Sequence, residues 1–250
     1  MAQKYTCQAE VPTVVLGVAA HPDDLEAGAG GTIAAWTKQG AQVYYLILTS
    51  GAKGIAESDA PHQDLAEARR QEQREAARIL GVADVFFCDH EDGLLTPSLD
   101  VKRDITRVIR QVRPDMVITM DPSMLFDHER GFINHPDHRA AGQATLDAVY
   151  PLARDHLSLP ELFFTEKLKP HKVPAVLLMN TARPNCYIDI TDTFDIKMHA
   201  LAAHKSQFPS THEAEDFLRE LAGRRGGQSG VQYAEAYLRV DVREPAALIV

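Results

Sequence analysis

The sequence predicts an α/β protein with a mostly parallel, Rossmann-like sheet that is covered by helices on both faces. Short apolar segments rich in β-branched and aromatic residues alternate with longer amphipathic segments along the 250 residues. This strict alternation favours right-handed βαβ units, whose parallel strands are buried on both sides. We expect a single domain over residues 1–250, in which residues 209–250 form a peripheral extension.

Six segments have the composition of buried strands. They are 13–19 (TVVLGVA), 42–50, 84–89, 115–121, 175–181 and 186–190. A Rossmann-type order of 3-2-1-4-5 places the first and fourth strands side by side, and ligands bind in the crevice outside the carboxyl ends of such strands. We therefore expect the active site at the ends of strands 1 and 4.

The predicted helices lie between these strands. They cover 30–40, 64–81, 101–114, 139–154 and 193–208. Gly81 and Pro114 are typical helix stops. The Gly- and Arg-rich segment 222–230 (AGRRGGQSG) predicts a mobile surface loop.

One predicted helix carries charges on the face that should be buried. Steps of 3.6 residues from Leu65 give Arg69, Glu72, Ala76 and Ile79. Buried charges are costly unless they are paired or functional. Either Arg69 and Glu72 form an ion pair on a solvated flank, or Arg69 reaches the crevice to bind a substrate hydroxyl or carboxylate while Glu72 holds it in place.

Composition favours small-molecule chemistry. A net charge of −9 argues against a nucleic-acid-binding surface, and no apolar run approaches the roughly 20 residues of a membrane span. The cysteines Cys7, Cys88 and Cys186 are odd in number and widely spaced, which favours a reducing compartment over a disulfide framework. We expect a cytoplasmic protein that binds neither nucleic acid nor membranes.

Two polar motifs follow strands 1 and 4. AHPDD ends at Asp24, and HPDH begins at His135 after an unusually long loop. His21, Asp24, His135 and His138 are therefore candidate ligands for one ion. Three protein ligands and an open position are typical of catalytic zinc, although Fe²⁺ and Co²⁺ accept the same donors.

Hydrolysis at a zinc-bound water requires a base and a group that stabilises the oxyanion. Asp23 lies next to a candidate ligand and can act as this base, while His135 can act on the other side. Asp121 and Asp137 could orient a histidine, or could be a loop carboxylate and a helix cap. Their roles stay open.

A dinucleotide site is disfavoured. Gly28, Gly30 and Gly31 resemble a GxGxxG fingerprint, but Ile33 occupies the third glycine position and no acidic residue follows the second strand. The glycines instead predict close packing of the first helix beside the metal loop.

Four segments together resemble the LmbE-like, or PIG-L, family of zinc-dependent N-acetylglucosaminyl deacetylases. They are AHPDDLEAGAGGTIA, RRQE (69–72), HPDHRAAG and KMHALAAHKSQF (197–208). One departure is Leu25, where many members have Glu directly after the HPDD residues. His204 lies near the edge of an apolar helix stripe, and we leave it outside the site.

The resemblance implies a Rossmann-like fold and a role for each matched residue. It implies zinc held by His21, Asp24 and His138, Asp23 as general base, His135 as the group that stabilises the oxyanion and helps the amine leave, and Arg69 and Asp92 as sugar contacts. Because family members are often homo-oligomers, it also implies a hexamer or trimer.

The leading hypothesis is metal-dependent removal of an acetyl group from an N-acetylglucosamine-type sugar or its conjugate. The alternatives are an amidase for a larger acylated amine, a non-haem Fe(II) oxygenase, and a non-hydrolytic metal- or sugar-binding module. Asp23 and His135 discriminate between them, since a binding module needs neither. The sequence leaves the natural substrate open.

Overall fold

The computed structural model describes residues 5–6, 11–54, 62–127, 131–208 and 212–242. Within them, an eight-stranded sheet has the order β1-β9-β10-β8-β5-β2-β3-β4. Its strands are β1 (Tyr5–Thr6), β2 (Val14–Ala19), β3 (Gln42–Thr49), β4 (Asp84–His90), β5 (Met116–Met120), β8 (Ala175–Met179), β9 (Cys186–Asp189) and β10 (Ala234–Asp241). The parallel strands β4-β3-β2-β5-β8 have the predicted 3-2-1-4-5 order. The fold-class prediction is confirmed.

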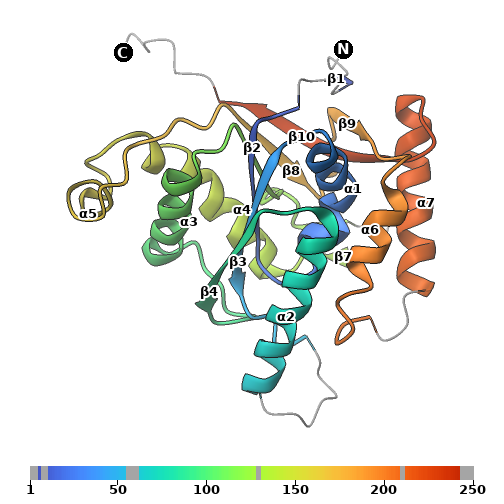
Figure 1. Cartoon of the computed structure of the whole chain (residues 1–250), viewed down its shortest axis with the longest axis horizontal. Coiled ribbons are helices and arrows are strands. Elements are labelled where there is room, and N and C mark those ends of the chain that lie inside the picture. The colour runs from blue at the N-terminus through green and yellow to red at the C-terminus, as the bar shows by residue number, and fades with distance from the viewer. Residues whose placement is uncertain (1–4, 7–10, 55–61, 128–130, 209–211, 243–250) are drawn as a thin grey trace.

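Helices cover both faces of this sheet (Figure 1). They are α1 (Asp24–Lys38), α2 (His62–Leu80), α3 (Leu99–Val112), α4 (Pro136–Val149), α5 (Pro160–Phe164), α6 (Phe194–Leu201) and α7 (His212–Ser229), with the 3-10 turn η1 (Leu152–Arg154). One apolar cluster joins α1, α2 and α6 to the sheet, and a second joins α3 and α4 to the opposite face. The loop after β5 contains a separate hairpin, β6 (Phe126–Asp127) and β7 (Phe132–Ile133).

The segment predicted as a loop over 222–230 is helical, and this prediction is wrong. Residues up to Ser229 belong to α7, and Gly230, with φ +83°, ends the helix. Gly226 is required by packing, because a Cβ there would lie 2.5 Å from the carbonyl oxygen of Gln232. The glycines permit a close contact between α7 and the turn that leads to β10.

The expectation of a peripheral extension over 209–250 also needs correction. β10 pairs antiparallel with β8 on one side and with β9 on the other, so this part of the segment belongs to the sheet. The buried Glu235 of β10 accepts hydrogen bonds from the backbone amides of Gly31 (3.1 Å) and Thr32 (2.8 Å) in the middle of α1.

Lys197 completes this buried network. Its Nζ lies 2.6 Å from Glu235 and donates to the Ala27 carbonyl at 2.8 Å. Glu235 is buried, but the Lys197 ammonium and hydrogen bonds from Thr32 hold the pKa of its carboxyl below the usual range. The ion pair therefore links α6 and β10 to the helix that begins at the AHPDD motif.

The glycines of α1 contact different elements from those expected. A Cβ at Gly28 would lie 2.4 Å from Met179 Sδ on β8, and a Cβ at Gly31 would lie 2.7 Å from Ile190 before α6. They permit close packing against β8 and the approach to α6, and the prediction that they pack beside the metal loop is wrong.

The cysteine prediction is wrong at one position. Cys186 is disulfide-bonded and Cys88 is free, whereas Cys7 lies outside the described residues. The cysteine pattern therefore no longer supports a reducing compartment.

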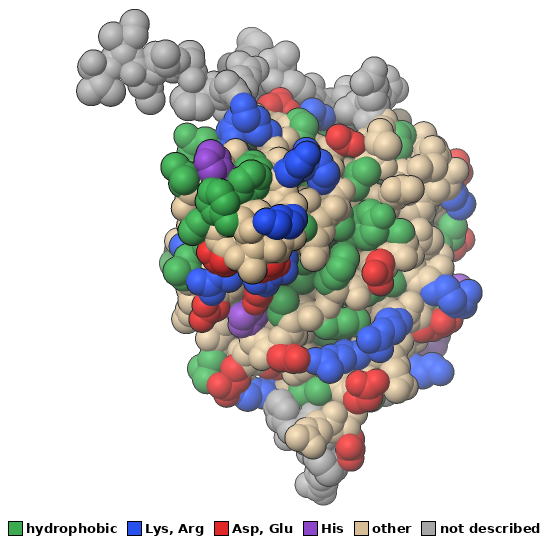
Figure 2. Space-filling model, turned by 60° about the vertical axis from the view of Figure 1, so that its left-hand side comes forward, with side chains coloured by type: hydrophobic (Ala, Val, Ile, Leu, Met, Phe, Trp, Pro, Cys, Tyr) green, Lys and Arg blue, Asp and Glu red, His purple; other side chains and the backbone are tan. Residues whose placement is uncertain are grey.

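The face shown in Figure 2 mixes charges of both signs, since Lys and Arg side chains are interspersed with Asp and Glu over its described part. Ion pairs join α3 to α5 and the residues after it on this side of the molecule, as in Arg103–Glu161 and Arg107–Glu166. Among the described helices, none combines the length and the apolar character needed to cross a bilayer.

Candidate active site

The two sequence motifs meet at the carboxyl ends of β2 and β5. β2 is followed by His21, and Asp23 is the N-cap of α1. The loop after β5 ends at His135, which is the N-cap of α4. The ring centroid of His21 lies 4.9 Å from that of His135 and 5.2 Å from that of His138. The predicted crevice is thus lined by three imidazoles that come from two distant segments.

Asp24 joins two of these histidines. Its Oδ1 lies 3.1 Å from His138 Nε2, and its Oδ2 lies 3.5 Å from His21 Nδ1. The same Oδ2 accepts a hydrogen bond from the His21 backbone amide at 2.8 Å. This bond fixes the carboxylate between the two rings.

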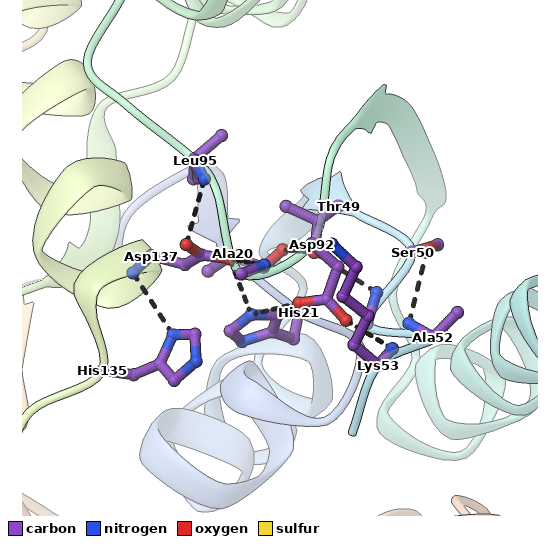
Figure 3. A network of polar contacts seen from close by, with 12 residues as sticks. Ala20, His21, Thr49, Ser50, Ala52, Lys53, Asp92, Leu95, His135 and Asp137 are labelled. Atoms are coloured by element: carbon purple, nitrogen blue, oxygen red, sulfur yellow. Dashed lines mark hydrogen bonds and ion pairs between the residues drawn. The ribbon is translucent and has the colours of Figure 1, made fainter. Parts of the chain in front are cut away.

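Two further carboxylates contact the other nitrogen of His21. Asp92 Oδ1 and Asp137 Oδ2 each lie 3.2 Å from His21 Nε2 (Figure 3). Asp137 is fully buried and accepts hydrogen bonds from the amides of Gly93 (2.7 Å) and Leu95 (3.1 Å). Burial disfavours charge on His21, but hydrogen bonds to Asp137, Asp24 and Asp92 raise the pKa of its imidazole to about 12. The surroundings of this ring strongly favour positive charge.

Asp23 has a backbone conformation that is unusual for a residue other than glycine. Its φ is +91°, in the left-handed region, and such strain persists only where the surroundings enforce it. Arg69 Nη2 donates to the Pro22 carbonyl at 2.7 Å and to Asp23 Oδ2 at 2.9 Å. Burial and the Asp24 carboxylate raise the pKa of Asp23 to about 7, against the opposing charge of Arg69. This value suits a general base near neutral pH.

A series of buried polar side chains holds the backbone of Asp23. Gln73 Oε1 accepts the Asp23 backbone N–H at 3.1 Å, and Gln73 Nε2 donates to Glu26 at 3.0 Å. Glu26 in turn lies 3.3 Å from His204 Nε2, and all three supporting side chains are fully buried. Because Glu26 accepts only, the Gln73 amide can face Asp23 only with its oxygen. Sequence reasoning missed Gln73, and it left outside the site His204, which lies at the far end of this buried network.

His135 presents one nitrogen toward the site. Its Nδ1 accepts the backbone N–H of Asp137 at 3.2 Å, so the neutral ring carries its proton on Nε2. Burial and the neighbouring His21 lower the pKa of His135, which favours this neutral form. A neutral imidazole with an exposed N–H can donate to a substrate oxygen.

The surroundings of Glu72 and the buried face of α2 differ from those predicted. Glu72 does not hold Arg69 but accepts hydrogen bonds from the Ser206 backbone and hydroxyl at 2.9 and 2.6 Å. The Arg69 guanidinium is almost completely buried and bonded to Asp23, Pro22 and Gly51. Arg69 and Ala76 of the predicted stripe are buried, but Gln73, Ala77 and Leu80 are buried where the stripe predicts Glu72 and Ile79.

The carboxylates of Asp92 and Asp121 also accept hydrogen bonds within the folded chain. Besides His21, Asp92 accepts the backbone N–H of Lys53 at 2.7 Å. Asp121 accepts from the Ser123 amide and hydroxyl at 2.9 and 2.6 Å, which is the loop-carboxylate interpretation. Asp137 both orients His21 and occupies the first turn of α4.

The donor set fits a divalent cation. Two groups of side chains here have potential ligand atoms within 4.8 Å of one another, namely His21, His135 and His138, and His21, Asp92 and Asp137. Asp24 lies beside the first group, with one oxygen 3.1 Å from His138 Nε2 and the other 3.5 Å from His21 Nδ1. The surrounding carboxylates supply the negative charge that such an ion requires.

Comparison with known proteins identifies the family. Residues 16–149 match the model of the PIG-L family, described as GlcNAc-PI de-N-acetylase. The diacetylchitobiose deacetylase of Thermococcus kodakarensis is 36% identical over 88% of this chain and 80% of that protein. The chain belongs to the PIG-L family.

Other PIG-L relatives extend the comparison. A probable N-acetyl-α-D-glucosaminyl L-malate deacetylase of Bacillus cereus is 32% identical over 77% of this chain and 83% of its own length. The solved N,N′-diacetylchitobiose deacetylase of Pyrococcus horikoshii superposes with a TM-score of 0.83 at 32% identity, covering 96% of this chain and 89% of that one. The predicted family resemblance is confirmed.

Proposed function

We propose that this chain is a metal-dependent deacetylase that hydrolyses the N-acetyl group of N-acetylglucosamine-containing substrates. The PIG-L description and the relatives named above share this activity. The observation that carries the proposal is the pair of adjacent carboxylates, in which Asp24 faces two histidines while Asp23 is held apart by Arg69. A module that only binds a metal or a sugar has no use for this second carboxylate.

His21, Asp24 and His138 would hold the ion. We favour Asp24 over His135 as the third ligand because His135 is exposed and caps α4 with its Nδ1. A zinc ion in this position would polarise the substrate carbonyl and lower the pKa of water. Asp92 and Asp137 would orient His21, as carboxylates commonly do for ligating histidines.

Asp23 and His135 would take part in proton transfer and hydrogen bonding to the reacting group. Asp23 would take a proton from the attacking water as the water oxygen bonds to the acetyl carbon. The His135 Nε2–H would donate to the developing oxyanion, and the C–N bond would break as the amine nitrogen takes up the proton that Asp23 removed from water, leaving acetate and a free amine. Arg69 would hold Asp23 in position, and its predicted sugar contact and that of Asp92 stay predictions.

The segment between β5 and His135 exposes apolar side chains. The hairpin exposes Leu125, Phe126, Phe132 and Ile133, whose accessible fractions are 52, 61, 46 and 78%. This surface supports the proposal of a homo-oligomer with an interface beside the active site. Sedimentation analysis tests it, and a monomer at micromolar concentrations would contradict it.

The first experiment measures acetate release from N-acetylglucosamine and N,N′-diacetylchitobiose. It compares the zinc-loaded chain, the same chain after chelation, and Asp23→Ala at equal metal content. We expect activity in the loaded chain, loss on chelation with recovery on adding zinc, and a loss of at least about 100-fold in Asp23→Ala.

The other outcomes separate the alternatives. Acetate release from neither sugar, together with cleavage of a larger acylated amine, would favour the amidase. Full activity in Asp23→Ala would refute its role as base. Metal binding with no hydrolysis of any of these amides would favour a binding module.

A further inference from the structure

A second group of metal-binding side chains lies at the outer edge of the sheet. Cys88 and His90 belong to β4, the terminal strand, and Asp104 belongs to α3. Potential ligand atoms of these three residues all lie within 4.8 Å of one another. His90 Nε2 and Asp104 Oδ2 are 3.1 Å apart. These residues take no part in the proposed deacetylase chemistry.

Local structure explains why the three side chains meet. The pairing of β4 with β3 shifts register between Phe87 and His90, and on this irregular stretch Cys88 contacts the apolar cluster beneath α3 while His90 contacts Asp104 of α3. Each of the three residues is partly buried, so solvent can reach the group.

The charges around Asp104 leave one of its oxygens facing His90. Arg107 Nη1 donates to Asp104 Oδ1 at 2.6 Å. Arg107 is itself paired with Glu166 through two hydrogen bonds of 2.8 and 3.1 Å, which offsets its positive charge. Carboxylates that bind metals are commonly held by such outer hydrogen bonds.

We propose that Cys88, His90 and Asp104 form a second site for a divalent cation of the zinc type. Thiolate, imidazole and carboxylate together suit Zn²⁺, whereas Mg²⁺ and Ca²⁺ prefer oxygen ligands alone. Three protein ligands leave a position for water. Because the ligands come from β4 and α3, a bound ion cross-links the edge strand to the helix and stabilises the folded chain.

Binding at this site releases a proton. A zinc-type ion binds the Cys88 sulfur as a thiolate, so the thiol proton passes to solvent as the metal–sulfur bond forms.

Cobalt(II) titration of the full chain tests the proposal. The candidate active site offers only nitrogen and oxygen donors, so a thiolate-to-cobalt charge-transfer band in the near ultraviolet reports the second site alone. We expect one equivalent of Co²⁺ to fill the candidate active site and a second equivalent to saturate this band. Added Zn²⁺ should make the band disappear. Zinc should also slow the modification of Cys88 by a thiol reagent.

Amino-acid substitutions test whether the cobalt band arises from this second site. Cys88→Ser should abolish it and leave deacetylation unchanged, and Asp104→Asn should weaken Co²⁺ binding roughly tenfold or more. His156→Ala, which alters an exposed histidine of another segment, is the matched control and should bind as the unchanged chain does. Circular dichroism checks that each variant is folded.

The absence of the band in the unchanged chain, or its persistence in Cys88→Ser, would overturn the proposal. Since the readout is cobalt absorption, either result is independent of whether the chain hydrolyses an acetylated sugar.

Discussion

Gln73 connects the proposed base to the interior, and replacing it with methionine tests whether this connection serves catalysis. Methionine keeps the length of the side chain but lacks both amide groups. Gln73→Met therefore removes the acceptor of the Asp23 backbone N–H (3.1 Å) and the donor to Glu26 (3.0 Å).

The magnitude follows from these two bonds. A hydrogen bond to a charged group contributes about 1.5–3 kcal/mol, and a buried donor left unpaired costs about 1–3 kcal/mol. We expect the free energy of unfolding to fall by roughly 2.5–6 kcal/mol. The larger consequence concerns geometry, since Asp23 at φ +91° loses one of the contacts that hold it. A displaced catalytic group commonly lowers the rate about 100-fold.

The assay measures kcat and KM for deacetylation at equal metal content, together with urea unfolding. We expect kcat to fall about 10- to 100-fold while KM changes little, because Gln73 holds the base and does not face the substrate. Gln71→Met is the control, because Gln71 is exposed on the same helix and bonds only to Glu67.

The reasoning fails if Gln73→Met loses stability but keeps kcat within about twofold of the unchanged chain. Gln73 would then be a structural residue of the α2 interface. A decrease in kcat shared by Gln71→Met would instead indicate a general effect on the helix.

Two further predictions concern the packing of β10 against α1 and α7. Glu235→Gln leaves Lys197 buried without its partner, and we expect a loss of about 3–5 kcal/mol. Because the folded-state pKa of Glu235 lies below its value of 4.5 in the unfolded chain, the stability advantage of the unchanged chain should be complete above pH 4.5 and decline as pH falls further. Urea unfolding between neutral and acid pH measures this difference, and a constant difference would contradict the assigned ionisation. Gly226→Ala should destabilise the chain by about 1–3 kcal/mol, because its Cβ would meet the Gln232 carbonyl, whereas Gly227→Ala has open space and should be neutral or slightly stabilising by thermal unfolding.

The sequence predicted the site residues that directly follow the carboxyl ends of parallel strands. Buried parallel strands are recognisable as apolar runs, and the strand order brings the residues after β2 and β5 together. His21, Asp24 and His138 therefore meet as expected. Their proposed roles as ligands stay a prediction, as does the role of Asp23 as base.

The parts that were missed depend on tertiary contacts. The polarity of Gln73 gives no sign of burial, which depends on how α2 packs against α1 and the sheet. The glycines after residue 222 predict a loop by local preference, but the turn before β10 packs against Gly226 and keeps the helix intact. β10 was not predicted as a strand, because Glu235 and Arg239 interrupt its apolar pattern.

The contact between β10 and α1 has a consequence for synthesis on the ribosome. The amides of Gly31 and Thr32 and the carbonyl of Ala27 find partners in Glu235 and Lys197, which are translated much later. A nascent chain that ends before β10 has α1 and both metal-binding motifs but lacks the carboxylate that anchors this helix. In such a chain Lys197 is present but its partner Glu235 is not, so the buried ion pair beside α1 forms only after β10 has been synthesised.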